Sequence, residues 1–340
     1  MTTTSPDAVL PARKPRKRTH FLRPPAGEDW RARLAEAERA AEEAFHSVRV
    51  WGPGGWTRAV LRLSGLVAWT LVAIPLQAAF VLAGSRTGRW GAARWFGKKY
   101  HAMNCAILGL SIRVLGRPEP HPPGRPVVFV CNHSSWLDVL VLGATLEAAF
   151  VAKAEVGTWP VIRTVARLGR TVFVSRRRTA AGREANEMAQ RLAEGASLVL
   201  FPEGTTSDGC RVLPFRSALF GAIDPNGPAV VVQPVSIVYD RLNGLPVTHK
   251  TRFHFAWYGD MEIGRHAVQI AGEPSGRVSL LFHAALDVAA VGNRKALTEQ
   301  TFAMVEAGAA GLRTGRIGAP GAEASPTLNR LPDGPDLQDA

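Results

Sequence analysis

The chain has 340 residues, of which 46% are hydrophobic, so it is long and apolar enough for a sizeable buried core in one large or two small domains. Its formal net charge of +13 indicates an anionic partner: a membrane surface, an acidic substrate or nucleic acid. The 3 cysteines are odd in number and lack zinc spacing, which argues against a disulfide framework or a zinc site.

The N-terminal region is basic and rich in proline. We expect residues 1–28 to form a disordered basic arm that is attracted to anionic lipid. A solvated tail is the alternative. Contact with DNA is a third option, but no recognition motif accompanies the arm, so we expect no nucleic-acid partner. Residues 29–58 are predicted to be a short helical lead-in, in which 29–48 is a charge-laced helix.

An uncharged apolar segment follows. Leu63–Gly84 is 22 residues long, enough to span a bilayer, and basic residues flank it on both sides. The positive-inside rule cannot place both flanks in the cytoplasm around a single crossing. Because a second apolar run, Met103–Ile112, follows, we favour a hairpin over a single span for the membrane-associated segment, residues 59–112. The predicted location is the bacterial inner membrane, with the rest of the chain on its cytoplasmic face.

Strand and helix patterns alternate from Ser111 onward. Strands are predicted at Ser111–Gly116, Val127–Cys131, Ala149–Ala152, Thr171–Val174, Ser197–Phe201, Ala229–Val238, Thr251–Trp257 and Arg277–Phe282, and helices at Trp136–Leu146, Trp159–Leu168 and Ala180–Ala193. This order predicts an α/β fold, a mostly parallel central sheet flanked by helices, preceded by an N-terminal membrane-embedded helical segment. The predicted domain covers residues 113–313, and residues 314–340 are predicted to be a disordered tail.

His133 and Asp138 form the first candidate site. His133 follows the buried strand Val127–Cys131 and precedes a helix that Ser134 or Ser135 can cap. An imidazole can take a proton from a hydroxyl near neutral pH, and a carboxylate on its other nitrogen fixes the tautomer. The loop must fold back for the two side chains to meet. The alternative is a histidine bonded to backbone, with Asp138 favoured by the helix dipole.

A second polar turn follows the strand Leu198–Phe201. Pro202 ends the strand, Glu203 supplies a carboxylate, and Gly204 lets a ligand approach the backbone. Parallel strands end at the same edge of a sheet, so we expect His133 and Glu203 to share one cleft. The alternative is that Glu203 is an ordinary turn residue.

Two further patterns suggest substrate contacts. The strand Thr171–Val174 leads to Arg176, whose guanidinium can bind phosphate; for the neighbouring Arg177 and Arg178 a solvated basic loop is the preferred interpretation. Pro234 and Val235 lie in a strongly apolar strand, where proline indicates a bulge or an edge. The same pair could form an apolar wall beside an acyl chain.

Taken in order, these blocks resemble the glycerolipid acyltransferases typified by 1-acylglycerol-3-phosphate acyltransferase. The resemblance covers about residues 60–260 and includes Lys153 and Pro160. It implies that His133 deprotonates an acceptor hydroxyl, oriented by Asp138, and that the hydroxyl attacks an acyl thioester of coenzyme A or acyl carrier protein. No cofactor or metal is expected, and Cys131 is expected to be structural. The implied substrate-binding residues are Asn132, Lys153, Arg176, Glu203, Gly204, Thr205, Thr206 and Arg216, with Pro234 and Val235 as the acyl-chain wall.

Two positions depart from the family pattern. Thr206 stands where relatives usually carry arginine, and Ser175 replaces the usual acidic residue. Both weaken the inference to a phosphate-bearing acceptor. We expect acylation of 1-acyl-sn-glycerol-3-phosphate to phosphatidic acid, with lyso-ornithine lipid as the alternative acceptor. A membrane-bound binding protein with an inactive site is the alternative of another class, against which the intact His133 and Glu203 blocks argue.

Overall fold

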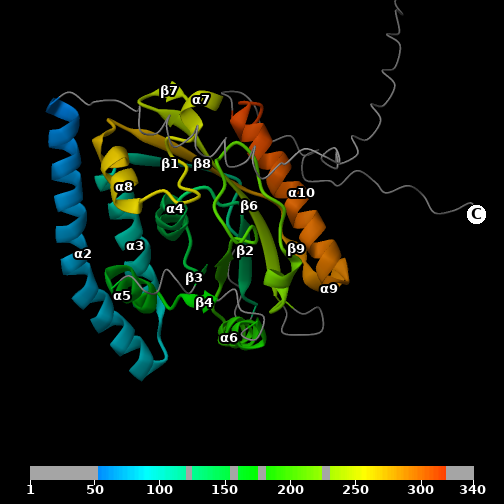
Figure 1. Cartoon of the computed structure of the whole chain (residues 1–340). Coiled ribbons are helices and arrows are strands. Elements are labelled where there is room, and N and C mark those ends of the chain that lie inside the picture. The colour runs from blue at the N-terminus through cyan, green and yellow to red at the C-terminus, as the bar shows by residue number, and fades with distance from the viewer. Residues whose placement is uncertain (1–52, 120–124, 154–159, 175–180, 224–229, 319–340) are drawn as a thin grey trace, which may run out of the picture. The chain divides into compact units, whose positions relative to one another are not determined.

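The computed structural model describes residues 53–119, 125–153, 160–174, 181–223 and 230–318 (Figure 1). The predicted basic arm, the charge-laced helix at 29–48, Arg176 and most of the predicted tail lie outside the described residues.

A central sheet organises the described part of the chain. Its strands run in the order β1-β8-β6-β2-β5-β3-β4, and β7 and β9 also pair with β6. Pairs among β1, β2, β3, β4, β5, β6 and β8 are parallel except for β6 with β8, while β7 and β9 are antiparallel to β6, so the predicted mostly parallel sheet is confirmed. The bounds are β1 Leu110–Leu115, β2 Val127–Cys131, β3 Ala149–Lys153, β4 Val172–Val174, β5 Leu198–Leu200, β6 Val231–Leu242, β7 Leu245–Pro246, β8 Gly276–Phe282 and β9 Leu286–Asp287.

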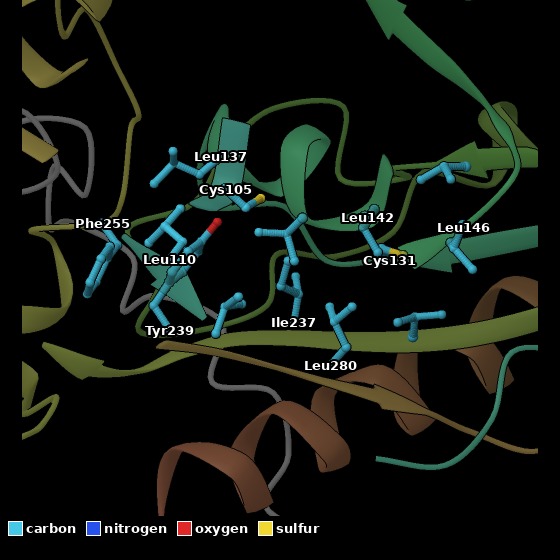
Figure 2. Packing of buried hydrophobic residues seen from close by; sticks show 14 of the residues in the cluster. Cys105, Leu110, Cys131, Leu137, Leu142, Leu146, Ile237, Tyr239, Phe255 and Leu280 are labelled. Carbon is cyan, nitrogen blue, oxygen red and sulfur yellow. The ribbon is translucent and has the colours of Figure 1, made fainter. Parts of the chain in front are cut away.

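Helices cover both faces of this sheet (Figure 1). Alternate residues of β6 face opposite layers, because side chains along a strand alternate. Ile237 and Tyr239 pack in the core on the α3 and α4 side, part of which Figure 2 shows, and Val238 packs against α10 on the other side. The bounds are α4 Leu137–Thr145, α5 Pro160–Leu168, α6 Ala181–Ala193, η2 Ser217–Phe220, α7 His249–Arg252, α8 Ile263–Gly272, α9 Val288–Val291 and α10 Arg294–Arg313.

One predicted strand is wrong. The stretch Thr251–Trp257 continues from the short helix α7 into a turn. Thr248 and Thr251 form a reciprocal capping box, in which each side chain bonds to the other residue's backbone, and this local bonding favours a helix start over an extended strand. In addition, β6 is longer than predicted and ends at Leu242.

The N-terminal described segment is a helical hairpin. The helix α2 (Pro53–Thr87) packs antiparallel on α3 (Gly91–Ile107), as shown by hydrogen bonds from Gln77 to the Ala93 carbonyl and between Thr70 and Tyr100. Among the described helices, α2 is long and apolar enough to cross a membrane, and most of its apolar side chains are exposed.

The predicted second membrane run, Met103–Ile112, is divided between two elements. Its first half ends α3 and its second half begins β1, which pairs with β8, so the sheet starts at Leu110, one residue before the predicted strand Ser111–Gly116. The hairpin is fastened to the rest of the structure by Arg58 and Arg62 of α2, which donate to backbone carbonyls at the end of α8, including those of Gly272 and Glu273.

Candidate active site

His133 and Asp138 meet, as the general-base interpretation requires. Nδ1 of His133 lies 2.8 Å from Oδ2 of Asp138. The loop folds back because the same oxygen accepts the backbone N–H groups of Ser134 and Ser135 at 2.7 and 2.9 Å. The expected serine cap is formed only as a long contact: Oγ of Ser135 accepts the backbone N–H of Leu137, the first residue of α4, at 3.4 Å, and Trp136 at the cap position makes no side-chain capping bond. The carboxylate of Asp138 in the first turn organises the helix start instead.

Asp138 is fully buried, so hydrogen bonds from the protein replace those of water at its carboxylate. Its second oxygen, Oδ1, accepts a 2.7 Å bond from the hydroxyl of Tyr239 in β6. An ionised carboxylate only accepts, so the proton between the two residues sits on Nδ1 of His133, which leaves Nε2 for a substrate. Tyr239 was missed from the sequence, since nothing in its local pattern indicates this contact.

Glu203 contacts the backbone of His133. Its carboxylate accepts the backbone N–H of His133 at 2.6 Å and that of Leu213 at 2.8 Å, and its side chain is buried. Burial raises the pKa of Glu203 to about 8 against the opposing effect of these two bonds. The expectation that Glu203 and His133 share a cleft is therefore wrong: Glu203 holds the backbone of His133 and does not line the cavity.

The turn after Glu203 does reach the candidate site. Gly204 has a positive φ of 67°, which glycine adopts without strain, and a Cβ there would come within 3.3 Å of the Arg216 guanidinium. Thr205, Thr206 and Arg216 line the same cavity as His133. Phe201 stacks on the His133 ring at a centroid distance of 4.0 Å, a second contact that the sequence did not indicate.

A cavity of about 1380 Å³ opens beside His133. Its walls come from α2, α3, α4 and α5, and they include Leu66, Val81, Leu140, Ile162 and Val165. A largely apolar space of this size next to a histidine suits a substrate with a hydrocarbon chain. The cavity was not predicted, because its walls come from four helices spread over residues 53–168 and the apolar run of α2 was interpreted only as a membrane segment.

Three predicted contacts are placed elsewhere. Asn132 is buried and uses its amide to donate to and accept from the backbone of Ile237, so it joins β2 to β6 and does not reach substrate. Pro234 and Val235 are inside the sheet, not at the cavity, so the predicted acyl-chain wall is wrong. Pro234 lies where the partner of β6 changes from β9 to β8, which explains a proline in a central strand.

Three predicted residues remain: Lys153, Arg176 and Cys131. Lys153 ends β3, and its backbone pairs with Val174 of β4. Arg176 is outside the described residues. Cys131 is buried, and burial raises the pKa of its thiol well above the usual value, which disfavours a nucleophilic role and fits the predicted structural one. Across the described residues no cluster of metal ligands occurs.

Comparison with known proteins places this site in a family. A family model described as Acyltransferase matches residues 112–238, which include His133, Asp138 and Glu203. A lyso-ornithine lipid O-acyltransferase of Brucella abortus is 40% identical over 72% of this chain and 90% of its own length. A protein of the same name from Rhizobium meliloti is 37% identical over 71% of this chain and 82% of its own.

The fold is also that of a solved structure, the 1-acyl-sn-glycerophosphate acyltransferase PlsC of Thermotoga maritima. The likeness has a TM-score of 0.50 at 22% identity and covers 74% of this chain and 98% of that one. Together with the family model and the named relatives, the polar site beside an apolar cavity is that of an O-acyltransferase. The chain belongs to the acyltransferase family.

Proposed function

We propose that the protein acylates the free hydroxyl of lyso-ornithine lipid with an acyl group from a thioester donor. The main support is the similarity to two proteins named lyso-ornithine lipid O-acyltransferase, which extends along 82% and 90% of their length. Thr206 gives independent support, because it lines the cavity where related phosphate-binding enzymes usually carry arginine. Lyso-ornithine lipid, the alternative acceptor expected from the sequence, therefore becomes the preferred one, and 1-acyl-sn-glycerol-3-phosphate becomes the alternative.

In the proposed reaction His133 acts as the general base. Nε2 takes the proton of the acceptor hydroxyl while the hydroxyl oxygen attacks the thioester carbonyl. Asp138 stabilises the imidazolium that forms. Collapse of the tetrahedral intermediate breaks the carbon–sulfur bond, and the imidazolium returns the proton to the leaving thiolate. The acyl chains of the two substrates would occupy the apolar cavity. Coenzyme A and acyl carrier protein are both chemically suitable donors, and no cofactor is needed for these steps.

Lysophosphatidate remains the second candidate acceptor. Arg216 favours it, because its guanidinium lines the cavity beside Gly204 and can pair with a phosphate. The same guanidinium can pair with the carboxylate of an ornithine headgroup, so Arg216 alone does not decide between the two.

A direct assay separates the two acceptors. Purified protein in detergent is given lyso-ornithine lipid or lysophosphatidate with one acyl donor, and His133→Ala serves as the control for enzymatic transfer. Preferred acylation of lyso-ornithine lipid supports the proposal. Exclusive use of lysophosphatidate would overturn it and restore phosphatidic acid as the product.

The proposed location is the bacterial inner membrane, with the sheet on the cytoplasmic side. The exposed apolar side chains of α2 and the lipid substrate support membrane association. A cysteine introduced at Thr3 should then resist labelling from outside the cell if the hairpin enters one leaflet and returns.

A further inference from the structure

A second pocket, of about 670 Å³, is lined by five arginines. It lies on the face of the sheet that α10 covers, and the arginines come from five separate elements: Arg113 of β1, Arg241 of β6, Arg252 of α7, Arg277 of β8 and Arg313 of α10. Bringing five guanidinium groups to one place costs free energy unless negative charge is present. Nothing in the candidate active site uses this pocket.

The acidic residue of the pocket, Asp240, neutralises one of the five arginines, Arg277. Asp240 accepts two hydrogen bonds from Arg277, at 3.0 and 2.6 Å, and a third from Ser279. Arg241 donates to the carbonyl of Gly244. Two of the five arginines are therefore already engaged within the protein.

The side chains of the other three make no hydrogen bond or ion pair with any described residue. They are Arg113, Arg252 and Arg313, and Nε of Arg252 is buried without a partner. Burial and repulsion from Arg252 lower the pKa of Arg313, despite the opposing effects of nearby acidic groups such as Glu306 and Asp208. These three half-buried guanidinium groups therefore leave donors facing an open pocket.

Size and lining restrict the ligand. The volume is far larger than one inorganic phosphate needs, and the apolar side chains of Val247, Leu312 and Ile317 share the lining with the arginines. Guanidinium groups bind phosphate oxygens in pairs, and an apolar wall suits a base or an alkyl arm. This mixture fits an organic molecule that carries several phosphates.

One turn connects the pocket with the candidate active site, and the pocket lies away from α2. The turn that brings Thr205 and Thr206 into the cavity continues to Gly209, whose backbone packs on the Arg252 side chain. Along β6, Arg241 is about 20 Å beyond Val235, which pairs with the end of β2. In contrast, α10 and α2 lie on opposite sides of the sheet, so the face that holds the pocket is not the one that α2 covers (Figure 1).

We propose that the arginine pocket binds the phosphate-bearing nucleotide end of coenzyme A, the leaving group of the acyl donor. The choice of coenzyme A rests on the proposed acyl-transfer function, whereas binding of an organic polyphosphate does not. An anionic lipid headgroup offers the same phosphate chemistry, but the position of the pocket on the α10 face disfavours it.

Calorimetry on the full chain in detergent tests the proposal. Coenzyme A should bind, dephospho-coenzyme A should bind more weakly, and inorganic phosphate should bind weakest. Arg252→Gln and Arg313→Gln should each weaken coenzyme A binding about tenfold or more, as expected for losing a charge-assisted hydrogen bond. Arg294→Gln, an exposed arginine at the opposite end of α10, is the matched control and should bind as the wild type does. If either pocket variant is poorly folded, Arg113→Gln repeats the test.

The outcomes separate this inference from the proposed function. Unchanged coenzyme A affinity in folded pocket variants would overturn the inference even if acyl transfer is normal. Loss of binding to phosphatidate vesicles, with coenzyme A binding retained, would assign the pocket to lipid and also overturn it. If the variants lose coenzyme A binding but the wild type acylates neither lysolipid, the pocket stands and the proposed function fails.

Discussion

Tyr239 donates a 2.7 Å hydrogen bond to Oδ1 of Asp138 from 101 residues further along the chain, while Oδ2 holds His133. The buried carboxylate is therefore shared between the loop that carries the histidine and the long strand β6. Tyr239 does not touch the cavity, so we regard it as a positioning residue.

Tyr239→Phe should lower turnover about tenfold with little change in the Michaelis constant for lysolipid, because the carboxylate that orients His133 loses an anchoring hydrogen bond, and a hydrogen bond to a charged group contributes about 1.5–3 kcal/mol. With one donor fewer, Asp138 stabilises the imidazolium more strongly, so the acid limb of the pH–rate profile should move to higher pH. Phe255→Leu is the control: it removes the ring stacked on Tyr239 at 4.9 Å and should lower stability without moving that limb. An unchanged pH profile in Tyr239→Phe would remove the positioning role.

His133→Ala should reduce acyl transfer by about 10²–10⁴-fold with the fold intact, which is the usual contribution of a general base. Asp138→Asn should be severely impaired as well, because an amide cannot accept all four of the hydrogen bonds that the carboxylate accepts. Initial rates with a thiol-reactive chromophore measure the released donor thiol. Retention of more than about a tenth of the activity in His133→Ala would exclude the general-base mechanism.

Glu203 makes stability depend on pH. In the folded state the carboxyl group of Glu203 keeps its proton up to its raised pKa of about 8, whereas in the unfolded chain it loses the proton near the ordinary pKa of 4.5. Its contribution is thus fully present below about pH 4.5 and is lost as the pH rises through 8, at no more than about 1.4 kcal/mol per pH unit. Thermal melts of wild type and Glu203→Gln between pH 5 and pH 8 should show a smaller decline in the variant. Parallel declines would show that another group is responsible.

Thr206→Arg distinguishes the acceptors within the cavity. A second guanidinium near Arg216 has no phosphate to meet on lyso-ornithine lipid, and repulsion and crowding should lower kcat/KM for that acceptor about tenfold. Thr206→Val keeps the size without adding charge and should retain most activity. Improved turnover of lyso-ornithine lipid by Thr206→Arg would contradict this account of the site.

Leu71 tests membrane attachment through α2. It is 67% exposed and belongs to the helix that is long enough to cross a bilayer, so Leu71→Asp should reduce flotation with liposomes. Leu245→Asp is the matched control, since Leu245 is 71% exposed in β7, and it should float as the wild type does. Equal flotation of both variants would show that α2 does not anchor the chain.

The parts that were predictable from the sequence depend on short-range patterns. Buried runs that end in polar turns placed β2 and β5, and the pair His133 and Asp138 lies within six consecutive residues. The failures involve long-range contacts. Glu203 faces the backbone of His133 instead of the cavity because two orphan N–H groups need its carboxylate, and Pro234 is hidden because β6 is central in the sheet. No local pattern reports such pairings.

Because α2 supplies part of the cavity wall through Leu66, Thr70 and Val81, the space beside His133 borders the apolar helix itself. With α2 in the bilayer, as proposed, a lysolipid would move sideways out of its leaflet into the site without passing through water. The substrate concentration that the site experiences is then the mole fraction of lysolipid in the membrane. Adding inert lipid while the bulk concentration of lysolipid is held constant should therefore slow the enzyme.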